Sequence, residues 1–177
     1  KLYYGVSEKD KENVISFSIS TMGFNGMILK KGGDAVFIDP VEVSGETYMV
    51  YNRKDNVSKE QFQCNFDELS ENISSNKVAT YAKETNADDG KLRKFRLAVA
   101  ATGEYSQFHI NNQNIAVTAS DLEKRAAVMS AIVTTINRVN GLYERDLGIT
   151  MELVADNSKI IFLDATTDNL TNKNTDN

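Results

Sequence analysis

Two side chains of this sequence belong to the types that most often bind zinc in proteins, the single cysteine Cys64 and the single histidine His109. A structural zinc site takes four protein ligands and a catalytic one takes three plus a water. The sequence has no further cysteine or histidine and no H-E-x-x-H pair. The chain by itself is therefore predicted to hold no zinc and to be catalytically inactive, with His109 as a hydrogen-bonded loop residue.

Carboxylates offer a second kind of chemistry. Glu144 and Asp146 flank Arg145 near the end of an expected helix. Residues two apart on a helix point in different directions, so a solvated or ion-paired helix end is favoured over an acid–base pair. Three more aspartates lie in a Thr- and Asn-rich C-terminal stretch, Asp164, Asp168 and Asp176. An oxygen-rich cation site is the alternative there to a solvated terminus.

The first third of the chain has the pattern of short antiparallel strands. In "VISFSIST" serines alternate with Ile15, Phe17 and Ile19, which is the period of a half-buried strand. Gly32 and Gly33 separate two further apolar runs, as a tight hairpin turn requires. Residues 1–66 are therefore predicted to form a β-rich domain. Residues 67–91 are polar, without a wide apolar face, and are predicted to be an exposed linker.

In the second half of the chain the spacing of the apolar residues changes. "FRLAVAATGEY" predicts a buried strand, and Ser120 with Glu123 predicts a capping box at the start of a long helix. Gly141 is expected to loosen the last turn of that helix. "GITMELVA" and "KIIFLDA" predict two strands after it. The stripe expected to be buried is Leu122, Ala126, Met129, Val133, Ile136, Val139 and Tyr143. Residues 92–177 thus predict strand, long helix, strand, strand, and the chain an α+β or α/β class.

Three stretches of the second half resemble the opening of the catalytic domain in reprolysin-like zinc metallopeptidases, above all the bacterial secreted members. They are "KFRLAVAATGEY", "IVTTINRVNGLYERDLGITMELV" and "NSKIIFLDATTDNLTN". The run from Asn137 to Asn140 is the most specific part. "VISFSISTMGFNGMILKKGGDAVFIDPVE" followed by "YMVYNRKD" is similar to the propeptide of the adamalysin branch. The resemblance implies a β-rich propeptide followed by the first part of a zincin-like (metzincin) domain.

The resemblance also implies chemistry that lies outside these residues. Members carry H-E-x-x-H-x-x-G-x-x-H, whose histidines bind Zn²⁺ and whose glutamate acts as general base. The zinc motif is therefore expected C-terminal to Asn177, in a secreted endopeptidase precursor. Cys64 would then be a cysteine switch, a thiolate on the open position of that zinc. The alternative for Cys64 is a buried small hydrophobe.

Composition narrows the expected partners. The net charge is -5, the pI is near 5.0 and the basic residues are dispersed, which argues against nucleic acid. No apolar run approaches the roughly 18 residues of a membrane span. The expected partners are the remainder of the chain's own catalytic domain and protein or peptide substrates. A noncatalytic secreted binding or adhesion module is the alternative function.

Overall fold

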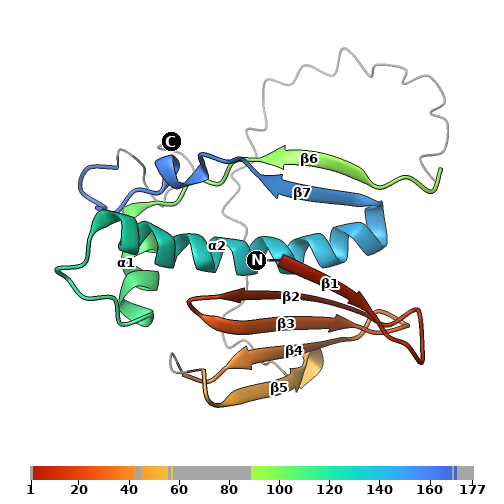
Figure 1. Cartoon of the computed structure of the whole chain (residues 1–177). Coiled ribbons are helices and arrows are strands. Elements are labelled where there is room, and N and C mark those ends of the chain that lie inside the picture. The colour runs from red at the N-terminus through yellow and green to blue at the C-terminus, as the bar shows by residue number, and fades with distance from the viewer. Residues whose placement is uncertain (1, 43–44, 56, 58–88, 169, 171–177) are drawn as a thin grey trace, which may run out of the picture.

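The protein has an α+β fold in which one long helix lies between two sheets (Figure 1). The computed structural model describes residues 2–42, 45–55, 57, 89–168 and 170. A five-stranded sheet covers one side of the helix, and a two-stranded sheet lies on the other side. No helix in the described ranges has the length and apolar character to cross a membrane.

The five-stranded sheet confirms the expected antiparallel β unit. Its strands pair in the order in which they occur along the chain, and every neighbouring pair is antiparallel. The strands are β1 (Leu2–Val6), β2 (Val14–Ser20), β3 (Gly23–Leu29), β4 (Ala35–Pro40) and β5 (Tyr48–Asn52), and the short 3-10 helix η1 (Arg53–Asp55) follows them. Gly32 and Gly33 have φ angles of 87° and 88°, so the turn between β3 and β4 uses the backbone freedom of glycine.

The face of this sheet that lies against the helix carries serines on β2 and the buried side chain of Met27 on β3, which pairs with Ser16. In β2 the serines are inside, with Ser18 fully buried, while Ile19 on the opposite face is 52% exposed. The helix approaches closely at Gly141, where a Cβ atom would lie 2.8 Å from both the Ser16 hydroxyl oxygen and the Met27 methyl carbon. The missing side chain of this glycine therefore lets the helix come close to both Ser16 and Met27.

The opposite face of the sheet carries a row of aromatic rings. Tyr3 stacks on Phe17 with ring centroids 4.9 Å apart, and Phe17 lies 5.2 Å from Phe24. Phe24 meets Tyr48 edge-on at 6.3 Å. The residues that share this face by strand register include no charged side chain, so the outer face is apolar and partly exposed.

The long helix α2 (Asp121–Leu147) begins as predicted. The Ser120 side chain accepts a hydrogen bond from the Glu123 amide, and the Glu123 carboxylate accepts one from the Ser120 amide. The helix ends at Gly148, which is left-handed with φ 62°. The expectation for Gly141 is wrong, because the helix continues unbroken to Leu147 and this glycine serves the contact with the sheet.

The predicted buried stripe of α2 is partly wrong. Leu122 is 78% exposed and Tyr143 is 41% exposed. The helix is covered on two sides, by α1 and β7 and by the sheet, so its buried arc is wider than one stripe and includes small polar residues. The buried residues are Ala127, Val128, Ala131, Ile132, Thr134, Asn137, Asn140 and Gly141.

The remaining elements correct two predictions. The strand expected in "FRLAVAATGEY" is β6 (Arg93–Leu97), shorter than predicted. The rest of that stretch leads to Thr102, which caps a helix that was not foreseen, α1 (Gly103–Asn112). β6 pairs in parallel with β7 (Ile149–Leu153). The strand expected in "KIIFLDA" is wrong. The 3-10 helix η2 (Asn157–Ile160) stands there, followed by a single bridge between Ala101 and Ile161.

The main core lies between α1, α2 and the segment after β7. It contains Ala101, Ile110, Val128, Ile132 and Ile161. A second, smaller apolar cluster belongs to the sheet and contains Met27, Leu29 and Ala35. This second cluster lies on the face of the sheet that α2 covers, because Met27 pairs with Ser16 and meets Gly141 of the helix.

Candidate functional site

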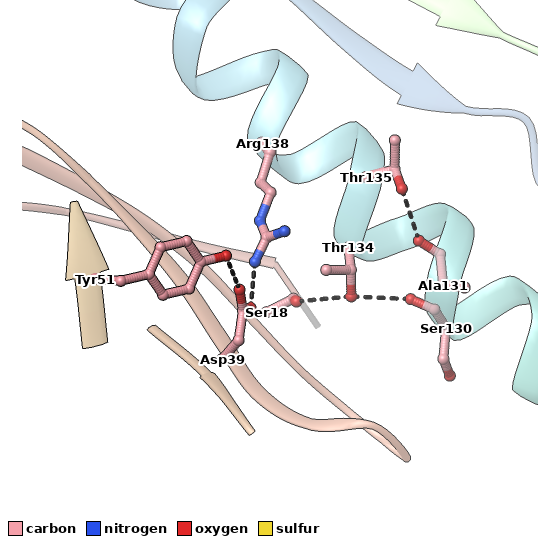
Figure 2. A network of polar contacts seen from close by, with 8 residues as sticks. All are labelled: Ser18, Asp39, Tyr51, Ser130, Ala131, Thr134, Thr135 and Arg138. Atoms are coloured by element: carbon pink, nitrogen blue, oxygen red, sulfur yellow. Dashed lines mark hydrogen bonds and ion pairs between the residues drawn. The ribbon is translucent and has the colours of Figure 1, made fainter. Parts of the chain in front are cut away.

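The most elaborate polar site joins the sheet to α2 (Figure 2). Arg138 of α2 forms an ion pair and hydrogen bond with Asp39 of β4. The Tyr51 hydroxyl donates to the other oxygen of the same carboxylate at 2.9 Å. The Arg138 guanidinium also lies over the Phe37 ring, 5.2 Å from its centroid. Burial raises the pKa of Tyr51, and the hydrogen bond to Asp39 and its negative charge raise it further.

Hydroxyl groups continue this contact along the helix. The Thr134 hydroxyl donates to the Ser130 carbonyl oxygen at 3.0 Å. The Ser18 hydroxyl oxygen lies 3.3 Å from the Thr134 hydroxyl oxygen (Figure 2). Because a threonine hydroxyl has one proton, Ser18 must be the donor in the second bond. Thr21 extends the row, with its hydroxyl 2.9 Å from that of Ser130. Among the described residues, hydroxyls and one ion pair thus make the polar part of the contact between the sheet and α2, beside the packing of Met27 on Gly141.

A cavity of about 340 Å³ lies beside these contacts. Side chains from β3, β4, α1 and α2 line it, including Asn25, Asp39, His109 and Arg138. Three buried nitrogen atoms have no hydrogen-bond partner among the described residues, Asn25 Nδ2, His109 Nδ1 and Arg138 Nε. The contact between the two halves is therefore not fully satisfied, in contrast to the usual rule for buried polar groups.

His109 lies in the last turn of α1, so its prediction as a loop residue is wrong. Its ring lies 4.4 Å from that of Tyr105 and 5.0 Å from that of Phe108. Burial lowers its pKa, which favours the neutral imidazole near pH 7. In the part of the chain that the structure describes, no three His, Cys, Asp or Glu side chains are grouped so that they could hold a metal ion.

The run from Asn137 to Asn140 has a structural role that its sequence did not reveal. Arg138 reaches the sheet, as above. The Asn140 amide donates to the Met151 carbonyl oxygen and accepts from the Met151 amide, both at 2.8 Å. Asn157 makes the same pair of bonds to the Val99 backbone, at 2.7 and 3.1 Å. The side-chain amides of two asparagines thus bond to the backbone of extended segments in the way that a neighbouring strand would.

Near the end of α2 the carboxylate of Asp146 forms an ion pair with Arg145, as predicted for this helix end. Arg145 Nε and Nη2 lie 2.6 and 2.9 Å from the two Asp146 carboxylate oxygens. These hydrogen bonds lower the pKa of Asp146. Glu144 instead lines a separate cavity of about 400 Å³ with Tyr4 and Met151. The two carboxylates are not placed as an acid–base pair.

The C-terminal aspartates are more ordered than predicted. Asp168 is 4% exposed, and its carboxylate accepts from the Gly103 amide at 2.6 Å and from the Leu170 amide at 2.9 Å. An anion at the start of α1 is favoured by the helix dipole. Asp164 accepts from the amide and hydroxyl of Thr166, which lower its pKa. Asp168 is therefore a buried structural anchor, and a solvated terminus is the wrong description for it. Asp176 lies outside the described residues.

Cys64 also lies outside the described residues, as does most of the predicted linker 67–91. The assignment of Cys64 as a zinc ligand therefore stays a prediction, and so do the domain boundaries at residues 66 and 91.

Comparison with known proteins gives one match. Residues 91–177 match the model of metallopeptidase family M12B, reprolysin-like. No curated protein and no solved structure matches the chain. The family match covers β6, α1, α2 and β7 and supports a reprolysin-like, peptidase-related origin for this half. The five-stranded sheet lies outside the matched range.

Proposed function

We propose that this chain is the N-terminal part of the precursor of a secreted zinc endopeptidase. Residues 1–66 are its pro-region, residues 67–91 its linker and residues 92–177 the opening of a metzincin-type catalytic domain. The observation that carries the proposal is the match of residues 91–177 to the reprolysin-like family. The match begins just before β6 and continues through the long helix and β7.

The small parallel sheet supports the presence of a larger domain. β6 and β7 form a two-stranded sheet among the described residues, and Phe95 of β6 is 51% exposed. Parallel sheets in proteins are almost always larger and covered on both faces. We propose that strands from the remainder of the catalytic domain complete this sheet, which makes that remainder the main partner of the present residues.

The residues present do not fit a zinc site. The sequence has one histidine, and the described residues hold no cluster of three potential ligands. In the proposal the zinc ligands come from the remainder of the domain, and the present chain alone is inactive. Its one contribution to the metal is Cys64, as a removable thiolate ligand.

A second candidate function, a noncatalytic secreted binding module, is favoured by the outer face of the sheet. This face is uncharged, and Tyr3, Ile19 and Val50 on it are 39%, 52% and 64% exposed. Contiguous exposed apolar surface is a feature of protein-binding sites.

A precursor that includes the sequence after Asn177 can distinguish the two candidate functions. The peptidase proposal expects stoichiometric zinc by elemental analysis and hydrolysis of a casein substrate after proteolytic activation. If this precursor binds no zinc and cleaves no substrate, the peptidase proposal is wrong and the binding module is the remaining candidate.

Cys64→Ala in the same precursor tests the switch separately. If the thiolate occupies the zinc, the variant should hydrolyse peptide before activation and melt at nearly the parental temperature. A variant that melts earlier and stays latent would assign Cys64 a structural role instead.

A further inference from the structure

We propose that two copies of this chain associate through the outer face of the five-stranded sheet, which is the face turned away from α2 (Figure 1). In the dimer the two sheets stack as the layers of a β-sandwich and are related by a twofold axis. The inference does not depend on the peptidase proposal. It gives the outer face a different use from the binding module that is the second candidate function.

The outer face is apolar across all five strands. Strand register places on it Ile15 and Phe17 of β2, Ile28 of β3, Val36 and Ile38 of β4 and Val50 of β5. The strands β1 to β5 bring no charged side chain to this face. Val50 is 64% exposed and Tyr48 is 40% exposed. A contiguous apolar surface of this kind is typical of a protein interface.

The charge distribution favours a second copy as the partner. The chain has 20 basic and 25 acidic residues and a net charge of -5, so two copies repel each other at long range. A twofold contact places the same surface patch of each copy against the other. An uncharged patch can make such a contact without bringing like charges together. A partner that is recognised by its charge would need complementary charges, which the five strands do not place on this face.

The shape and size of the outer face also fit a second sheet. Its strands have 5 to 7 residues. With about 4.8 Å between strands and about 3.3 Å per residue, the face measures roughly 24 Å by 17 Å, or about 400 Å² as a flat area. Two such faces bury about 800 Å² of flat area, and the relief of the side chains brings this close to the roughly 1,200 Å² of a small specific interface.

The aromatic rings of the outer face are held in place before association. Phe17 stacks on Tyr3 with ring centroids 4.9 Å apart and lies 5.2 Å from Phe24. The Tyr48 hydroxyl accepts a hydrogen bond from the Phe24 amide at 3.4 Å. Side chains that are already fixed lose little conformational entropy when a partner covers them. The burial of these rings therefore contributes to association with little entropic cost.

The test measures the mass of the 177-residue chain in solution by sedimentation velocity and light scattering, from about 1 to about 200 μM protein. We expect a reversible dimer, twice the 19.7 kDa of one chain, with a Kd on the order of micromolar for an interface of this size. Raising NaCl from about 0.1 to about 0.5 M should not weaken it, because the contact has no charge pair to screen.

Two neighbouring residues of β5 provide a matched pair of variants. Val50→Lys places an ammonium group on the outer face of each copy and should raise the Kd at least about tenfold. Met49→Lys lies on the opposite face of the same strand, where Met49 is 51% exposed, and should leave the Kd unchanged. Val50→Thr keeps the β-branched shape and should raise the Kd less, in the same direction. Melting curves show that each variant is folded.

Three outcomes would overturn the inference. The chain could stay monomeric at about 200 μM, which is far above the expected Kd. Met49→Lys could weaken the dimer as much as Val50→Lys, which would place the contact on another face. A monomeric chain could bind to phosphatidylcholine vesicles in a flotation assay and lose this binding in Val50→Lys, which would assign the outer face to a lipid surface.

Discussion

The two sides of α2 pack against their neighbours through different kinds of side chain. Towards α1 and β7 the helix buries Val128 and Ile132 against Ala101 and Ile161. Towards the sheet it buries Thr134, which is bonded to Ser18, and Gly141, which packs on Ser16 and Met27. The same helix therefore packs in an apolar core on one side and in a contact that combines hydrogen bonds with apolar packing on the other.

The difference has an energetic consequence. Full burial of a Val or Ile side chain contributes roughly 1.5–3 kcal/mol, whereas an ordinary hydrogen bond contributes about 1 kcal/mol after desolvation. The apolar side should therefore dominate the stability of the helical half. The polar side should determine where the sheet docks. Substitutions on the two sides are expected to differ in size and in what they disturb.

The largest effect is expected from a charge in the apolar side. Val128 is fully buried, and Val128→Asp would place a carboxylate there without a partner, so the free energy of unfolding should fall by about 4 kcal/mol or more. Leu122→Asp on the same helix is the control, because Leu122 is 78% exposed and an acid in the first turn is favourable. Denaturant unfolding measures both. Similar losses would contradict the observed phase of the helix.

The next effect concerns the asparagine that fixes β7. Asn140→Leu removes both bonds to the Met151 backbone and leaves an amide and a carbonyl without partners. A loss of about 2–4 kcal/mol is expected. Hydrogen exchange should show the Met151 amide losing its protection. Asn111→Leu, at an exposed position of α1, is the matched control. Unchanged protection at Met151 would show that β6 alone holds β7.

A smaller effect is expected on the polar side. Ser18→Ala and Thr134→Val each remove one hydroxyl of a shared bond, and each should cost about 1 kcal/mol. The double variant should lose less than the sum of the singles, because both lose the same interaction. Thermal melts of the four proteins complete the cycle. Strict additivity would mean that the two hydroxyls do not interact in solution.

The smallest effect is a pH dependence. Burial lowers the pKa of His109 in the folded state below its ordinary value of 6.5. Between the folded and unfolded pKa values the unfolded chain binds more protons, so stability is complete above pH 6.5 and declines as the pH falls below it. Denaturant midpoints at neutral and mildly acidic pH measure this slope. In His109→Phe the slope should disappear, and a slope that persists would belong to other groups.

The candidate site could be predicted from the sequence only in part. The resemblance picked out the run from Asn137 to Asn140 without indicating what it contacts. Its partner Asp39 lies 99 residues earlier, in a stretch with no pattern that points to a helix. Asn140 pairs with Met151, across the end of the helix. Such pairs depend on distances between elements, which a single sequence does not contain.

The sequence by itself determined the features that depend on neighbouring residues. The capping box of Ser120 and Glu123, the glycine turn at Gly32 and the alternation of β2 are all local, since their hydrogen bonds and dihedral angles involve residues close in the chain. Tertiary structure alone decided which face of each element is buried. The serine face of β2 lies inside because α2 covers it, with Gly141 close to Ser16, and Thr134 is buried because the sheet covers that side of α2. Burial depends on the shape of the partner surface, and in this protein the partner is distant in sequence.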